Sequence, residues 1–171
     1  EFYVYSFDGG LDGLDTIRLQ GGRFSYEVKC ERPSTLVMVF PNFSEQPIFA
    51  EPGEEVEIKG DASHLKELEV KGTKTNELMN TFREQIANAS PPKVVSYAEQ
   101  FIKDHPASAV SFYLLRRYFI ATPNPDYSKA LALVRVMSGA QPANGVLERY
   151  EKQLVSLDRV KIGKMLPKFS A

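Results

Sequence analysis

Residues Phe49 to Gly72 read FAEPGEEVEIKGDASHLKELEVKG, and this stretch divides a front half rich in strand patterns from a back half rich in helix patterns. Its Pro52-Gly53 pair is typical of a turn. Polar and apolar side chains then alternate over Glu55–Lys59 and again over Leu68–Val70, as they do in half-buried strands. From Thr73 onward the apolar residues recur about every three and a half positions, which indicates helices.

Length and charge limit the possible organisation and function. The chain has 171 residues, which suits one domain or two small, closely packed subdomains. Its net charge of −1 gives no overall field that would attract nucleic acid or an acidic membrane. Residues 1–72 carry 14 acidic and 7 basic side chains, whereas residues 73–171 carry 8 and 14. We interpret the opposite signs as two halves docked together; the alternative is a basic helical half that faces an acidic partner.

The first 72 residues are predicted to be β-structure. Arg23–Cys30 shows the clearest alternation in the chain, and the Gly21-Gly22 pair before it predicts a tight hairpin. The turns are too short for crossover helices, so we expect an antiparallel β-sandwich or open barrel. The expected strands, about seven in all, are Phe2–Phe7, Asp15–Gln20, Arg23–Cys30, Thr35–Phe40, Gln46–Glu51, Glu55–Lys59 and Leu68–Val70.

The remaining residues predict a small antiparallel helical bundle, which makes the fold class α+β. Prolines divide this part of the chain, and two of them follow a capping residue, as at Ser90-Pro91. We expect a β subdomain over residues 1–72 and a helical subdomain over residues 73–159. The helices are expected at Asn76–Asn88, from Pro91 to His105, and at Ala107–Ile120, Tyr127–Met137 and Val146–Leu157.

No group of residues predicts catalysis, a metal or a cofactor. The two histidines, His64 and His105, lack the spacing of metal-ligand pairs. Cys30 is the only cysteine, so it cannot form an intrachain disulfide, and the alternation places it on an apolar face. The acidic cluster from Glu51 to Glu57 is interpreted as a solvated strand surface. We therefore expect this chain not to be an enzyme.

Aromatic residues give the only candidates for binding. The strip from Phe40 to Phe49, with Pro41-Asn42-Phe43-Ser44 as a turn inside it, is the candidate contact surface. Phe40, Phe43 and Phe49 are its candidate binding residues, and core packing is the competing interpretation. A second hypothesis is a sandwich that binds glycan or cell-wall fragments. The chain has no Trp for a sugar platform, so Tyr3, Tyr5, Phe43 and Phe49 would have to supply the rings.

The order of several short motifs resembles a known family. The motifs are Arg23-Phe24-Ser25-Tyr26 after the hairpin glycines, Phe49-Ala50-Glu51-Pro52-Gly53, Val56-Glu57-Ile58-Lys59-Gly60-Asp61, Val70-Lys71-Gly72-Thr73-Lys74-Thr75-Asn76 and Phe101-Ile102-Lys103-Asp104-His105-Pro106-Ala107-Ser108. In this order they resemble an uncharacterised domain common in secreted proteins of the Bacteroides group. In that family the domain precedes a thioredoxin-like module of the thiol-disulfide oxidoreductase or peroxiredoxin-like type.

The resemblance implies an accessory role. Residues 160–171 resemble a linker and the entry strand of such a module, with Leu166 where Ala is usual, so we expect the chain to be trimmed at this end. The module's Cys-x-x-Cys pair would lie downstream, and Cys30 matches no redox position. The implied function is a non-catalytic accessory or interaction domain of a periplasmic or envelope oxidoreductase. The implied partners are its own thioredoxin-like module, protein substrates or a second copy in a homodimer.

Overall fold

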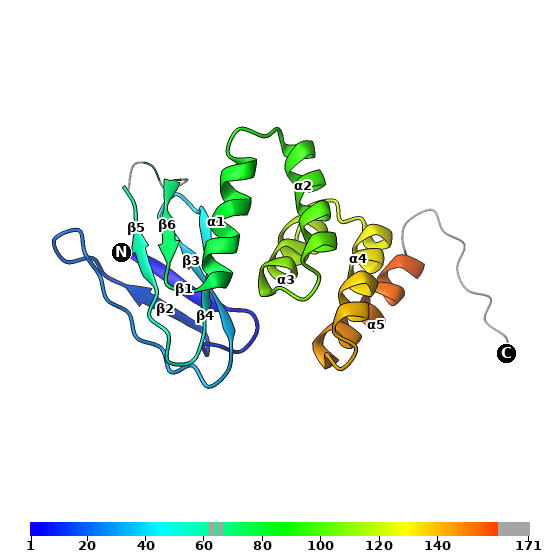
Figure 1. Cartoon of the computed structure of the whole chain (residues 1–171), viewed down its shortest axis with the longest axis horizontal. Helices are drawn as coiled ribbons and strands as arrows, with labels where there is room; N and C mark the ends of the chain where they lie inside the picture. Colours follow the sequence, from blue (N-terminus) through cyan, green and yellow to red (C-terminus); the bar gives the residue numbers. More distant parts are fainter. Residues whose placement is uncertain (62–63, 65–66, 161–171) are drawn as a thin grey trace, which may run out of the picture. The chain divides into compact units, whose positions relative to one another are not determined.

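The computed structural model describes residues 1–61, 64 and 67–160, which form a mixed α+β protein (Figure 1). Within them, six strands lie in two antiparallel sheets and five α-helices follow. The chain divides into two compact units, Glu1–Asn88 and a second unit that begins at Ala89. The predicted linker and module entry at 160–171 lies outside the described residues from position 161 onward. No described helix is both long enough and apolar enough to cross a membrane.

The first unit contains both sheets. The larger has the order β2-β1-β3-β4, and its antiparallel register places Tyr3 opposite Val39 and Val39 opposite Glu45. The smaller pairs Ile58 with Val70. The strands are β1 (Phe2–Ser6), β2 (Leu14–Ile17), β3 (Ser34–Val39), β4 (Glu45–Ala50), β5 (Glu57–Lys59) and β6 (Glu69–Lys71).

The two sheets share one hydrophobic core. Its members alternate along each strand, because successive side chains of a strand point to opposite faces. Phe2 packs its ring against Phe40, with the ring centroids 5.4 Å apart. The cluster comprises Phe2, Val4, Ile17, Leu36, Met38, Phe40, Ile48, Leu68 and Val70.

The segment Arg23–Cys30 is not the strand that its alternation predicted. Gly21 and Gly22 do turn the chain with positive φ values of 58° and 75°, but among the described residues the segment's only β-pairing is an isolated bridge between Gln20 and Arg23. Beyond it residues 24–30 belong to no ladder, and half-buried and exposed side chains alternate along them. The alternation arises from packing, because Phe24, Tyr26 and Val28 are half-buried against the core while their neighbours are exposed. The result is six strands in two open sheets, and the sandwich or barrel of about seven strands is not confirmed.

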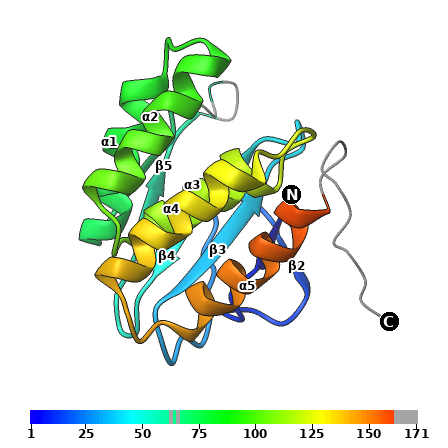
Figure 2. The same cartoon turned by 90° about the vertical axis from the view of Figure 1, so that its right-hand side faces the viewer.

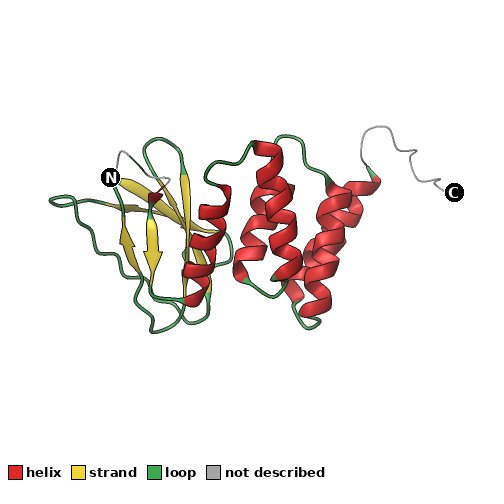
Figure 3. Ribbon diagram, turned by 45° about the horizontal axis from the view of Figure 1, so that its top comes forward, coloured by secondary structure: helices red, strands yellow, loops and turns green. Residues whose placement is uncertain are grey.

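Helix α1 (Lys74–Ile86) packs against β4 and β6 in the first unit (Figure 3). Thr73 caps it by accepting a hydrogen bond from the Asn76 backbone N–H, 3.2 Å long. The Asn76 side chain is buried and pairs with both backbone groups of Phe49 on β4. Its Oδ1 accepts from Phe49 N at 2.9 Å, and its Nδ2 donates to Phe49 O at 2.8 Å. Asn76 thereby occupies the place of a neighbouring strand.

One helical turn later, Asn80 makes the same kind of contact with the smaller sheet. Its Nδ2 donates to Val70 O at 2.6 Å, and its Oδ1 accepts from Val70 N at 3.4 Å. Residues four apart lie on one face of a helix, so the two amides can reach two different strands. Helix α1 therefore ties β4 to β6. These contacts explain why α1 belongs to the same compact unit as the strands. The sequence pattern predicts instead that a helical subdomain begins at residue 73.

The second unit is helical, and α4 and α5 lie side by side in it (Figure 2). The helix expected from Ala107 to Ile120 is α-helical to Leu115 and then continues as a π-helix, closed by a bond of 2.7 Å from Ala121 N to Arg116 O. The elements are α2 (Pro91–Asp104), α3 (Ala109–Leu115), the π-helix (Arg116–Ile120), α4 (Tyr127–Ala140) and α5 (Gly145–Arg159).

An acidic side chain joins two helices of this unit. Glu99 on α2 accepts from Lys103 on its own helix and from Lys129 on α4, both at 2.8 Å. The hydrogen bonds from Lys103 and Lys129 hold the pKa of the Glu99 carboxyl below its ordinary value. The carboxylate therefore stabilises this unit above its ordinary pKa, and the contribution is lost as the pH falls through the lowered value.

Candidate interaction site

The three phenylalanines expected to form a contact surface lie in different environments. Phe40 is 9% exposed and belongs to the core, and Phe49 is 2% exposed. Phe43, in contrast, is 88% exposed, the largest value among the exposed large hydrophobic residues of the described chain. Of the three, only Phe43 can meet another molecule without unfolding the sheet.

Phe43 lies in the turn between β3 and β4, and hydrogen bonds within the turn fix its backbone conformation. The Phe43 N–H donates to Phe40 O at 2.8 Å, and Phe40 N donates to Ser44 O at 3.0 Å. Asn42 Oδ1 accepts from Ser44 N at 3.0 Å and from Ser44 Oγ at 2.6 Å. This pattern resembles a hairpin loop in which a three-residue turn ends in a left-handed residue.

Phe43 is that left-handed residue, with a φ of 62°. It is the only non-glycine residue with positive φ in the described chain. The position normally takes glycine or asparagine, because a Cβ in this conformation crowds the following carbonyl oxygen at roughly 1–2 kcal/mol. The sequence identified the turn, but nothing in its pattern indicated which of its residues takes positive φ.

The two other strands of the larger sheet, β1 and β2, also expose apolar side chains. Tyr3 on β1 is 47% exposed, and it lies opposite Val39 at the end of β3 that leads into the turn. Leu14 on β2 is 65% exposed and lies opposite Tyr5. The Tyr5 hydroxyl donates to Glu45 Oε1 at the start of β4, over 3.5 Å. We use the name Phe43 turn for residues 40–44.

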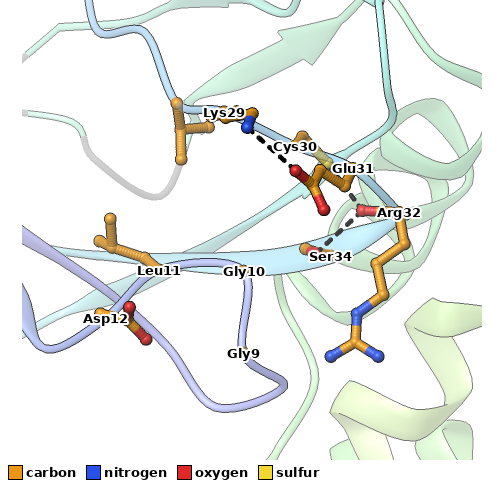
Figure 4. A pocket seen from close by; sticks show the side chains of 10 residues that line it. Gly9, Gly10, Leu11, Asp12, Lys29, Cys30, Glu31, Arg32 and Ser34 are labelled. Carbon is orange, nitrogen blue, oxygen red and sulfur yellow. Dashed lines mark hydrogen bonds and ion pairs between the residues drawn. The ribbon is translucent and has the colours of Figure 1, made fainter.

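Cys30, the only cysteine, helps to line a separate open depression of about 820 Å³ (Figure 4). Cys30 is half-buried, and its thiol donates to the Arg32 carbonyl at 2.7 Å. Beside it, Lys29 and Glu31 form an exposed ion pair of 3.0 Å. The depression is lined by Gly9, Gly10, Leu11, Asp12, Val28, Lys29, Cys30, Glu31, Arg32 and Ser34. The lining carries both acidic and basic side chains, and the thiol is already bonded to a carbonyl. The depression therefore does not indicate which class of ligand it would bind.

The remaining polar residues considered from the sequence lie apart from one another. His64 approaches Asp61 at 4.0 Å on the surface, whereas the His105 ring packs against Phe101 with centroids 4.7 Å apart. In the described part of the chain, no three or more His, Cys, Asp or Glu residues are grouped as metal ligands. Tyr26 donates to Asp15 Oδ2 at 3.0 Å, and desolvation and this hydrogen bond raise the pKa of its phenol to about 12.

Replacing Phe43 with asparagine is expected to raise the free energy of unfolding by up to about 1 kcal/mol. Asparagine tolerates the left-handed conformation, and an 88% exposed ring has little burial to lose. Urea unfolding followed by circular dichroism measures the change, and this signal suits a chain without Trp. A loss above about 1 kcal/mol would show that Phe43 supports the fold.

Comparison with known proteins adds a family match to the first unit. Residues 1–79 match the model of a family described as a domain of unknown function, DUF4369. The match covers both sheets and part of α1, including Phe43 and Asn76. It confirms that an uncharacterised domain is present, and the link to thioredoxin-like modules stays a prediction. Neither a curated protein nor a solved structure matches the chain.

Proposed function

We propose that this chain is a non-catalytic interaction domain and that the Phe43 turn is its principal protein contact. The observation that carries the proposal is a phenylalanine that is 88% exposed and held at a φ of 62°. Both features are unfavourable for the isolated fold, since the ring stays in water and the backbone is strained. A partner that buries the ring would offset both.

The energetics favour a protein partner with an apolar pocket. Aromatic residues are enriched in the cores of protein interfaces, and a few buried anchors carry most of the binding energy. The hydrogen bonds of Asn42 and Ser44 hold the turn in place, so little conformational freedom is lost on binding. Tyr3 on β1 and Leu14 on β2 supply further exposed apolar surface on the same sheet.

We propose a thioredoxin-like module as the partner and the periplasm or cell envelope as the location. Both rest on the order of motifs along the chain, which resembles domains placed ahead of such modules. In this role the domain positions the redox module or its protein substrates, and the redox chemistry belongs to the module. Cys30, whose thiol is bonded to the Arg32 carbonyl, has no part in it.

The test begins with the natural reading frame beyond Ala171. We expect it to encode a module of roughly a hundred residues with a Cys-x-x-Cys pair. That module, expressed separately, is titrated into the isotopically labelled chain, and NMR shift changes should concentrate at residues 40–44. A frame without such a module, or a titration that leaves the Phe43 turn unaffected, would contradict the proposal.

A second candidate function is the binding of glycan or cell-wall fragments. The exposed rings of Tyr3 and Phe43 favour it, because sugars stack on accessible aromatic faces. A thermal-shift screen with glycans and peptidoglycan fragments is the test, since a ligand of the folded state raises the melting temperature. We expect no shift if the chain is a protein-interaction domain, and a specific shift would place the second function first.

A further inference from the structure

Half-buried and exposed side chains alternate along the segment Arg23–Cys30 as they do along a strand, yet beyond Arg23 its backbone pairs with no described part of its own chain. After the bridge at Arg23, no backbone hydrogen bond joins residues 24–30 to any other described residue. Amide and carbonyl groups left open along an extended segment are a ready template for another strand. The segment is also anchored, because Tyr26 donates to Asp15 and the Phe24 ring packs on Phe2.

The two faces of this segment have different roles. The apolar face, which includes Tyr26 and Val28, already packs against the core of the first unit. The outer face carries alternating charges at Glu27, Lys29 and Glu31, and all three residues are exposed. An incoming strand therefore adds at the edge of the segment, and the charges on the outer face select its register.

We propose that this edge pairs with the same segment of a second copy, antiparallel and about a two-fold axis at Val28. In this register Glu27 of each copy lies opposite Lys29 of the other, so the symmetry gives two attractive cross-strand pairs. The apolar residues of both copies also stay on one side of the two-stranded sheet that the pair forms. The dimer is a self-complementary interface of the kind that two-fold symmetry produces.

The neighbouring registers are less favourable. A shift that centres the pairing on Glu27 places two Glu27 carboxylates opposite each other, and a shift that centres it on Lys29 does the same with two lysines. Like charges directly opposite in a sheet are destabilising. Those two registers differ from the Val28 register by two residues in the pairing. A slip of the pairing by one residue would instead turn the apolar face of one copy outward. The charge pattern thus favours the register centred on Val28.

Charge reversal tests this register directly. Glu27→Lys gives a homodimer with lysine opposite lysine, and Lys29→Glu gives glutamate opposite glutamate. Each variant should raise the dimer dissociation constant about tenfold or more, measured by sedimentation equilibrium over a concentration series. An equimolar mixture of the two variants should restore wild-type affinity, because the heterodimer again has two attractive pairs.

Controls separate this interface from other effects. Both substituted residues are exposed, and the Lys29–Glu31 pair is 87% and 79% exposed, so folding should be retained and circular dichroism can confirm it. Lys152→Glu on α5 changes the net charge by the same amount as Lys29→Glu and should leave dimerisation unchanged. A wild-type chain that stays monomeric at every concentration would overturn the proposal. So would single variants that dimerise as the wild type does, or a mixture that fails to restore affinity.

Discussion

Replacing Asn76 with alanine is expected to lower the free energy of unfolding by about 2 to 5 kcal/mol. The change removes the two hydrogen bonds to Phe49, of 2.9 and 2.8 Å, and the 2.7 Å bond to Thr73 Oγ1. It takes the Asn76 amide away from a buried N–H and a buried C=O on β4, and losing a hydrogen-bond partner is costly for a group away from water. Domains are stable by about 5–15 kcal/mol, so this loss is a large share of the total.

Urea unfolding measures this loss, and three variants refine its interpretation. Gln85→Ala removes an exposed polar side chain from the same helix and should have almost no effect. Asn80→Ala should be milder than Asn76→Ala, since Asn80 is half-buried and one of its two bonds to Val70 is 3.4 Å long. Asn76→Asp keeps the shape but cannot donate to Phe49 O. An Asn76→Asp variant as stable as the wild type would contradict the role given to this amide.

Replacing Gly72 with alanine is expected to destabilise the first unit by about 3 to 5 kcal/mol. Gly72 has a φ of 116°, which L side chains rarely adopt. A Cβ at this position would also overlap the carbonyl oxygen of Glu55 in the chain that leads into β5. Both effects act at the junction of β6 and α1, so the pairing of β5 with β6 should be lost first.

Hydrogen exchange at the β5 and β6 amides measures this effect, together with the midpoint of unfolding. Gly139→Ala on α4 is the matched control, because a Cβ built there meets no described atom within 4 Å apart from its chain neighbours and the nearby backbone of its own helix. It should stabilise the chain by roughly 0.5–1 kcal/mol, since alanine favours helix over glycine. If the two alanine variants were equally stable, the tight packing at Gly72 would be refuted.

The structure explains one motif that the sequence could only identify by resemblance. Within Val70–Asn76, Val70 is a core residue, Gly72 makes the close approach, Thr73 caps α1 and Asn76 bonds to β4. Periodicity predicted the strand and the helix on either side. It did not predict the bonds from Asn76 to Phe49, because these join residues 27 positions apart.

Two other structural features could not be predicted from the pattern of side chains alone. The alternation of Arg23–Cys30 correctly placed Phe24, Tyr26 and Val28 toward the core, yet a ladder also needs a neighbouring backbone in register, which side-chain pattern alone does not specify. Phe40 and Phe43 were grouped as aromatic candidates, but one is a core residue and the other is exposed. The left-handed φ of Phe43 directs its ring into solvent, whereas the Phe40 ring stays in the core. Turn propensities could not predict this, because they favour glycine at the position of Phe43.

If Phe43 serves binding at some expense to the fold, the Phe43→Asn variant should bind the partner more weakly than the wild type. Titration calorimetry compares this variant with the wild type, using the separately expressed thioredoxin-like module as the probe. We expect the variant to bind at least about tenfold more weakly, as for an interface anchor, with no loss of stability. Equal affinity of the two proteins would contradict it.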